Sequence, residues 1–275
     1  MQYLTQSVVS PENVQPFDLT DRGLLLADGV FDTSRVANGR TILRRAHLLR
    51  LAKDAAALGI KVNAATLDEL AGNAVPENGY GALRLSITRG PGARGLDGET
   101  TAAPTLISRF MPMELAFPAS PVKLTISAIL RNPTSPTACH KTLAYTDNVM
   151  ALREAVSAGF DDAFLLSPGG NVACTTAANV FARFGRRLVT PPQSDGALGG
   201  VIRGWLLDQG SANGFKVAEE SLTPERLLQS DGVFLTNSLR VFQPVGAFGS
   251  KAFDVTLPPD LMGMGKALLE DAYDD

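Results

Sequence analysis

The sequence predicts an α/β (α+β) protein built from two lobes. Segments that alternate apolar and polar residues, as strands do, are interspersed with segments of helical periodicity along the chain. The length of 275 residues suits about two ordinary domains, and one large α/β domain would also fit. The proline-rich stretch FPASP separates two groups of these segments. We therefore predict a small N-terminal α/β lobe over 1–116, a linker over 117–121 and a larger C-terminal lobe over 122–275.

The first lobe is predicted to contain a helix followed by two strands. In ILRRAHLLRLAKDAAALGI (42–60), helical spacing places Leu48 and Leu51 on one face. ALRLSITRG (82–90) alternates apolar and polar residues as a half-buried strand does. After the Gly-rich loop GPGARGLDG, the run PTLISRF (104–110) predicts another strand.

The second lobe is predicted to begin with a strand and then mix helices with further strands. Its strands are rich in β-branched and aromatic residues, and its helices show the wider apolar spacing. The predicted strands are 122–130, 163–167, 171–184, 187–192 and 232–237, and the predicted helices are 146–158, 199–210 and 259–272.

The composition excludes several classes of function. A net charge of −3, with both signs interspersed, argues against a general binder of nucleic acid or of anionic membranes. No apolar run approaches the length of a membrane span, and the N-terminus lacks a secretory pattern. Cys139 and Cys174 provide neither a disulfide framework nor metal-ligand spacing, so we expect no metal site. The expected location is the cytoplasm.

Several segments carry residues suited to chemistry. In CHKTLAY (139–145), Lys141 lies between a turn and a predicted helix, whereas the other lysines have ordinary solvated positions. The loop SDGALGG opens directly into a helix at Val201, where free N–H groups and the helix dipole suit a phosphate. Arg50 shares a helix face with His47 and could bind a phosphate in a bidentate manner or be solvated. Each signal is weak alone.

Taken together and in order, these segments resemble a known family. The motifs are DRGLLLADGVFDTSRV, AHLLRL, KTLAYTDNVMA, NVACTTAANVF, VTPP and ALGGVIRG, which together with the segment around Thr236 extend from about residue 21 to 245. They resemble the successive motifs of the class IV, fold-type IV pyridoxal-phosphate enzymes. That family includes branched-chain and D-amino-acid aminotransferases, (R)-amine transaminases and 4-amino-4-deoxychorismate lyase. The resemblance implies the D-amino-acid aminotransferase-like fold.

The resemblance implies a role for each matching residue. Lys141 falls on the lysine that forms the Schiff base with pyridoxal 5′-phosphate and serves as the base at the substrate carbon. Tyr145 falls on a tyrosine that, in the branched-chain members, hydrogen-bonds the phenolic oxygen of the cofactor. The implied contacts to the cofactor phosphate are Arg50, the helix-start amides of Val201 and Ile202, and Thr236.

Cys174 departs from the family pattern. Family members usually carry a glutamate at this position, which keeps the pyridine nitrogen of the cofactor protonated. A thiol is a weak donor that brings no stable negative charge, so it should favour an unprotonated ring nitrogen. Because transamination needs the full electron sink more than elimination does, Cys174 is expected to bias the site toward elimination. A shifted register or a decayed activity would also explain this residue.

The details that concern the substrate point to different branches of the family. The loop GPGARGL lacks the Arg-x-His pair of D-amino-acid aminotransferases, and it resembles the lyase branch together with the AAN of TTAANVF. Tyr145 instead resembles the branched-chain and amine-transaminase branches. Arg94 and Arg35 are candidates to hold a substrate carboxylate.

The favoured activity is 4-amino-4-deoxychorismate lyase, which forms 4-aminobenzoate and pyruvate on the route to folate. An aminotransferase for branched-chain or D-amino acids or (R)-amines is the first alternative. A binding protein that has lost catalysis is the second. The resemblance also implies a small-molecule amino substrate and a homodimer in which the partner subunit helps to close the site. The roles of His47, His140 and Cys139 stay open, with packing favoured for His140.

Overall fold

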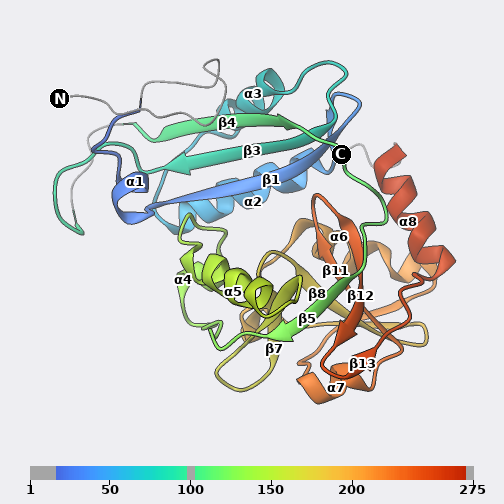
Figure 1. Ribbon diagram of the computed structural model, residues 1–275. Helices are drawn as coiled ribbons and strands as arrows, with labels where there is room; N and C mark the ends of the chain where they lie inside the picture. The colour runs from blue at the N-terminus through green and yellow to red at the C-terminus, as the bar shows by residue number, and fades with distance from the viewer. Residues whose placement is uncertain (1–16, 98–102, 271–275) are drawn as a thin grey trace.

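The computed structural model describes residues 17–97 and 103–270 (Figure 1). Its strands form two separate sheets, one with four strands from residues 29–112 and one with nine strands from residues 122–252. Helices pack on both sheets, so the predicted mixed α/β class is confirmed. The division into two lobes joined at 117–121 stays a prediction, which this partition of the strands supports.

The first sheet is antiparallel, and helices cover one of its faces. Its strand order is β2-β1-β3-β4. Apolar residues of the two longer helices and the sheet form one buried core that includes Leu51, Leu67, Leu83 and Ile87. The elements of this part are α1 (Arg22–Leu26), β1 (Gly29–Ala37), β2 (Arg40–Thr41), α2 (Arg44–Ala57), α3 (Ala64–Ala74), β3 (Gly81–Thr88) and β4 (Thr105–Pro112).

The second sheet is mixed, with strand order β10-β9-β8-β11-β12-β5-β6-β7 and β13 paired to β12. Its strands are β5 (Val122–Ile126), β6 (Asp162–Leu166), β7 (Val172–Thr175), β8 (Asn179–Phe184), β9 (Arg187–Thr190), β10 (Lys216–Glu219), β11 (Gly232–Asn237), β12 (Val241–Phe248) and β13 (Lys251–Ala252). Its helices are α4 (Pro136–Cys139), α5 (Thr146–Ser157), α6 (Val201–Gln209), α7 (Pro224–Leu228) and α8 (Pro259–Glu270), with 3₁₀ turns at Gln193–Asp195 and Ser211–Asn213.

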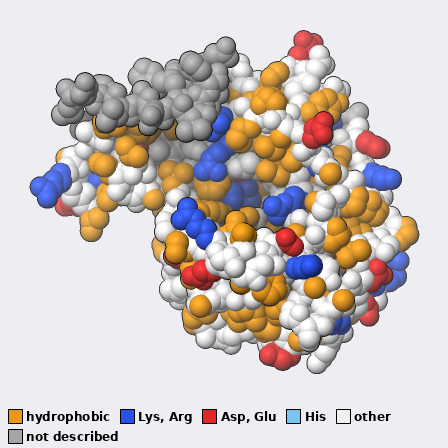
Figure 2. All heavy atoms as spheres, in the orientation of Figure 1, with side chains coloured by type: hydrophobic (Ala, Val, Ile, Leu, Met, Phe, Trp, Pro, Cys, Tyr) orange, Lys and Arg blue, Asp and Glu red, His pale blue; other side chains and the backbone are white. Residues whose placement is uncertain are grey.

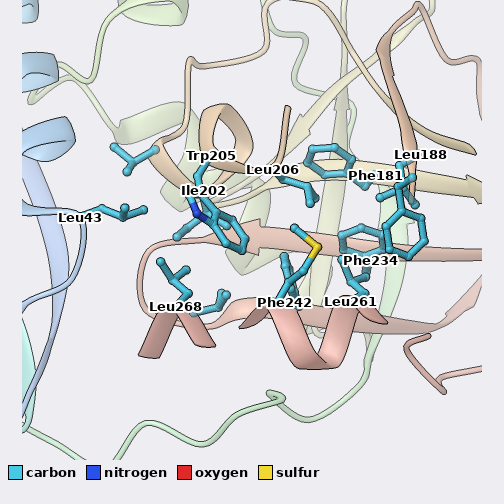
Figure 3. Packing of buried hydrophobic residues seen from close by; sticks show 14 of the residues in the cluster. Leu43, Phe181, Leu188, Ile202, Trp205, Leu206, Phe234, Phe242, Leu261 and Leu268 are labelled. Atoms are coloured by element: carbon cyan, nitrogen blue, oxygen red, sulfur yellow. The ribbon is translucent and has the colours of Figure 1, made fainter. Parts of the chain in front are cut away.

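Both faces of the second sheet are buried around its central strands. Because successive side chains of a strand point to opposite faces, Phe181 and Phe234 lie on one face while Val180 and Leu235 lie on the other. The two phenylalanine rings stack with centroids 5.3 Å apart. Figure 3 shows them packed with side chains from α6 and α8, including Trp205. This core fixes α6, whose first residues face the other sheet.

Most predicted elements are confirmed to within a few residues, but two are wrong in extent. The last two positions of the predicted helix 259–272 lie outside the described residues. The predicted strand 171–184 is divided into β7 and β8, because Thr175 N–H donates to Ala178 O and Thr176 binds the buried Asp162 through its N–H and Oγ1. The predicted strand 122–130 ends at Ile126. The sequence patterns did not predict β1, β12 or α3.

Candidate active site

A cavity of about 290 Å³ opens between the two sheets. Its lining comes from β1, α2 and β3 on one side and from the loop before α5, β7, the start of α6 and the end of β11 on the other. Figure 2 shows Lys and Arg side chains gathered around the hollow between the two parts of the molecule. Residues that are far apart in the sequence therefore meet around one basic, partly apolar space.

The cavity brings together the residues predicted to bind the cofactor. Lys141, Tyr145 and Cys174 line it, and so do the predicted phosphate contacts Arg50, Val201, Ile202 and Thr236. Arg35 and Arg94, predicted to bind a substrate carboxylate, do not line it. The structure thus places the amine, the cationic fork and the helix start around one space, whereas the role of each residue stays a prediction.

Lys141 is held by its backbone and points across two aromatic rings. Its carbonyl accepts from Phe31 N–H at 2.9 Å, and Val30 forms an antiparallel bridge with Thr142. Its Nζ donates to Tyr145 Oη at 3.0 Å and lies 4.4 Å from the centroid of the Phe31 ring. The amine is therefore positioned by a strand of the first sheet and by a phenol at the start of α5.

One end of the cavity has the properties of a phosphate site. Arg50 donates to Asp32 from Nε at 2.8 Å and from an Nη at 2.9 Å, which fixes its guanidinium. The first N–H groups of α6 have no side-chain cap. Thr236 Oγ1 is buried and has no hydrogen-bond partner among the described residues. The remaining nitrogen of Arg50, Nη1, is 3.4 Å from Gly199 O in the loop before α6. The positive charge of Arg50, a helix start and a buried hydroxyl together fit a phosphate group.

A side chain at Gly200, the N-cap of α6, would displace Asn179. A Cβ added at Gly200 would lie 2.0 Å from Asn179 Oδ1, whereas one added at Gly204, in the same helix, would meet nothing within 4 Å. Asn179 Nδ2 in turn donates to Leu198 O at 2.8 Å and so holds the preceding loop. The close approach of this loop to β8 therefore depends on the absence of a side chain at Gly200.

A buried ion-pair network supports Arg50. Burial on its own raises the pKa of Asp32, but the opposite charges of His47 and Arg50 and the hydrogen bond from His47 outweigh it. The net pKa of Asp32 is below its usual value, so the carboxylate stays ionised. His47 Nδ1 lies 2.6 Å from Asp32 Oδ1, which assigns His47 to this network.

Cys174 places a neutral thiol in the cavity. It lies on β7, opposite Leu165 of β6, and is 6% exposed. Burial raises the pKa of Cys174 to about 11, although the charges of Arg131 and Lys141 lower it. The thiol is therefore protonated at neutral pH.

The sequence patterns missed two arginines of the cavity, Arg84 and Arg131. Arg84 Cζ lies 3.7 Å from the centroid of the Phe31 ring, and its guanidinium donates no hydrogen bond to any described residue. Burial lowers the pKa of Arg84, but an arginine stays charged at neutral pH. Arg131 donates to the carbonyls of Thr137 and Ala138, both at 3.1 Å. The alternation in ALRLSITRG was a usable signal for Arg84, because it places this residue on the face opposite Leu83.

The other candidate residues have structural partners or lie away from the cavity. Arg35 donates to Leu239 O at 2.8 Å and also to Leu115 O. Arg94 lies in an exposed loop. His140 Nδ1 is 2.8 Å from Asp54 Oδ1, and Cys139 Sγ donates to Pro133 O at 3.4 Å.

Two other kinds of site are not found. Within residues 17–97 and 103–270, no group of three His, Cys, Asp or Glu side chains could hold a metal ion. In the same part of the chain, no helix is both long enough and apolar enough to cross a membrane.

Comparison with known proteins identifies the family. The model of the family "Amino-transferase class IV" matches residues 29–248. A provisionally named branched-chain-amino-acid aminotransferase of Methanocaldococcus jannaschii is 31% identical over 233 residues, which cover 82% of this chain and 80% of that protein. The D-alanine aminotransferase of Bacillus licheniformis is 28% identical, with 89% of this chain and 87% of that protein covered.

A solved structure that is named for a third activity has the same fold. The crystal structure of a provisionally named 4-amino-4-deoxychorismate lyase from Legionella pneumophila superimposes with a TM-score of 0.83 at 27% identity. The match covers 94% of this chain and 98% of that chain. The chain therefore belongs to the class IV aminotransferase family, whose members are enzymes that use pyridoxal 5′-phosphate.

Proposed function

We propose that the cavity binds pyridoxal 5′-phosphate with its phosphate at the start of α6 and its aldehyde end at Lys141. Arg50, the N–H groups of Val201 and Ile202, and the unpartnered hydroxyl of Thr236 would hold the phosphate. When bound, the cofactor supplies an aldehyde that condenses with amines and a ring that withdraws electrons. Tyr145 would keep Lys141 Nζ oriented through their 3.0 Å contact.

We further propose that the enzyme is a 4-amino-4-deoxychorismate lyase. The observation that carries this proposal is the neutral, buried thiol of Cys174 in the cavity that also contains Lys141. A neutral partner for the ring nitrogen gives a weaker electron sink than a carboxylate does, and elimination tolerates this better than transamination. Lys141 Nζ is the group that can take the proton from the amine-bearing carbon of the substrate.

Arg84 supports a substrate that carries carboxylates. The products 4-aminobenzoate and pyruvate each contain one carboxylate, so their common precursor contains two. Arg84 lines the cavity with its guanidinium donors unused by the described residues, and Phe31 keeps it over the cavity wall. Such a cation can bind a planar carboxylate through two parallel hydrogen bonds. We therefore assign substrate binding to Arg84, with Arg35 and Arg94 kept as predictions.

An aminotransferase activity is the second candidate, and two observations favour it. Tyr145, which resembles a tyrosine of the branched-chain members, lines the cavity and accepts a hydrogen bond from Lys141 Nζ. The Methanocaldococcus jannaschii relative is also named for branched-chain amino acids. In this case a simple amino donor would transfer its amino group to the bound cofactor, which a lyase restricted to its own substrate would not allow.

We also propose that the enzyme is a cytoplasmic homodimer. Large apolar side chains are exposed on α1, at Leu24 and Leu25, and on the outer face of α5, at Val149 and Val156. Because α5 also carries Asn148 of the cavity lining, a second copy covering this face would lie close to the site. Sedimentation at micromolar concentration tests the dimer.

The visible spectrum of the purified protein tests the function. An absorption band that borohydride removes, with the added mass located on Lys141, would support the cofactor and its attachment. Persistence of the band with simple amino acids, together with release of pyruvate from aminodeoxychorismate, would support the lyase. Rapid loss of the band with alanine or glutamate would establish the aminotransferase instead and refute the proposed role of Cys174.

A further inference from the structure

Asp54 is a buried carboxylate that the proposed chemistry does not use. It lies on α2, one helical turn after Arg50, and is 3% exposed. Its two oxygens contact consecutive residues of the loop between α4 and α5 (residues 140–145), here called the lysine loop because it carries Lys141. Oδ1 is 2.8 Å from His140 Nδ1, and Oδ2 accepts from Lys141 N–H at 3.0 Å. Burial of a carboxylate is costly unless its oxygens are hydrogen-bonded, and here both are.

The backbone of Lys141 is therefore held from two sides. On one side, β1 binds the loop, because Phe31 N–H donates to Lys141 O and Leu143 N–H donates to Gly29 O, both at 2.9 Å. On the other side, Asp54 accepts the Lys141 N–H, which no β-strand ladder would otherwise satisfy. Lys141 belongs to no helix or strand, so these contacts hold its backbone in place.

Helix α2 connects this contact to the phosphate end of the cavity. Arg50 and Asp54 are four residues apart and thus lie on the same face of α2. Arg50 is proposed to bind the cofactor phosphate, and Asp54 binds the loop that carries the cofactor's amine. The separation between these two groups is thereby fixed by one turn of a rigid helix.

We propose that Asp54 is a positioning residue that fixes the backbone of Lys141, with His140 as its second contact, and so sets the distance between Lys141 Nζ and the phosphate site. This inference rests on the proposed function of Lys141 as the amine that binds the cofactor. It also assigns a role to His140: the Asp54–His140 pair keeps the carboxylate oriented toward the Lys141 N–H.

Two substitutions separate positioning from mere stability. Asp54→Ala removes both acceptors. Asp54→Asn keeps one acceptor for the Lys141 N–H and offers an amide donor, which His140 can accept at Nδ1 by changing its tautomer. Asp21→Ala is the matched control, since Asp21 is fully buried in the same part of the molecule and accepts from Gly23, Thr88 and Thr105.

The experiment compares two ligands with each variant. 4′-Deoxypyridoxine 5′-phosphate lacks the aldehyde and reports on the phosphate site, whereas pyridoxal 5′-phosphate also forms the adduct that borohydride reduces on Lys141. We expect Asp54→Ala to bind the first ligand within about threefold of wild type but to form the adduct about tenfold more slowly, as for loss of one charged hydrogen bond. Asp54→Asn should recover most of this rate, and Asp21→Ala should leave both values unchanged.

A measurement on the apoprotein is independent of the cofactor. The Lys141 amide should exchange its hydrogen slowly in wild type and about tenfold faster in Asp54→Ala, since its acceptor is lost. Exchange at the random-coil rate in wild type would overturn the inference even if Asp54→Ala cannot be purified. A parallel loss of both ligands in Asp54→Ala, or an unchanged adduct rate, would also overturn it. Absence of any adduct in wild type would instead refute the proposed function, and amide exchange would still test the contact.

Discussion

Replacing Cys174 by glutamate should convert the site toward transamination. With a pKa of about 11, about one thiol in 3,000 is ionised at pH 7.5, since each pH unit below the pKa is a factor of ten. A glutamate with an ordinary pKa near ~4.3 would stay about 90% ionised or more at pH 7.5 even if burial raised that pKa by about 2 units. The substitution therefore exchanges a neutral group for a nearly full negative charge inside the cavity.

The expected result is a faster amino-donor half-reaction. A stabilisation of the protonated ring nitrogen by even one pKa unit corresponds to about 1.4 kcal/mol, or about tenfold. The assay mixes the cofactor-loaded enzyme with alanine or glutamate and follows loss of the visible band. Cys174→Ser is the matched control, because serine is similar in size and neutral, and it should behave like wild type. If Cys174→Glu raised lyase turnover and left the half-reaction absent, the reasoning would be wrong.

Three further predictions concern the phosphate site and its support. Thr236→Val should weaken binding of 4′-deoxypyridoxine 5′-phosphate by about tenfold, as for one lost hydrogen bond, which calorimetry measures. It should not lower the stability of the apoprotein in urea unfolding, because no described residue is hydrogen-bonded to the replaced hydroxyl. Gly200→Ala should also weaken binding, because its Cβ would lie 2.0 Å from Asn179 Oδ1, while Gly204→Ala should not. The stability that Asp32 contributes should be present above its unfolded pKa of about 3.9 and be lost as pH falls through its lower folded pKa. The free energies of unfolding in urea of wild type and Asp32→Asn should therefore converge in acid. A difference between them that is constant with pH would contradict this.

Local patterns predicted the strands and helices whose periodicity is regular, but they missed β1. Its burial alternates from Asp32 to Ala37, but the buried positions include the polar residues Asp32 and Ser34, so the hydrophobicity of the sequence does not follow the burial. A buried aspartate becomes favourable only when His47 and Arg50 arrive from α2, and no local pattern reports that contact.

The ordered resemblance predicts most of the site, and the local patterns miss Arg84 and Arg131 for different reasons. Arg131 lies in the loop between β5 and α4, where no periodicity applies. The alternation in ALRLSITRG places Arg84 on the polar face of a half-buried strand, which normally faces water. In the structure that face borders the cavity, because the second sheet lies across from it. Whether a polar strand face meets solvent or another sheet depends on the arrangement of the two sheets, which the strand's own residues do not encode.

The arrangement of α2 explains why buried charges are tolerated at this site. His47, Arg50 and Asp54 recur three and four residues apart, so they share the helix face that would otherwise carry core leucines. Each has a polar partner. His47 and Arg50 contact the carboxylate of Asp32, and Asp54 accepts a hydrogen bond from Lys141 N–H. Removing Asp32 would leave both His47 and Arg50 without their buried partner of opposite charge, which costs more than the pair contributes. Because Arg50 and Asp54 share one face of α2, the helix holds the proposed phosphate contact and the loop that carries Lys141 in one fixed relation.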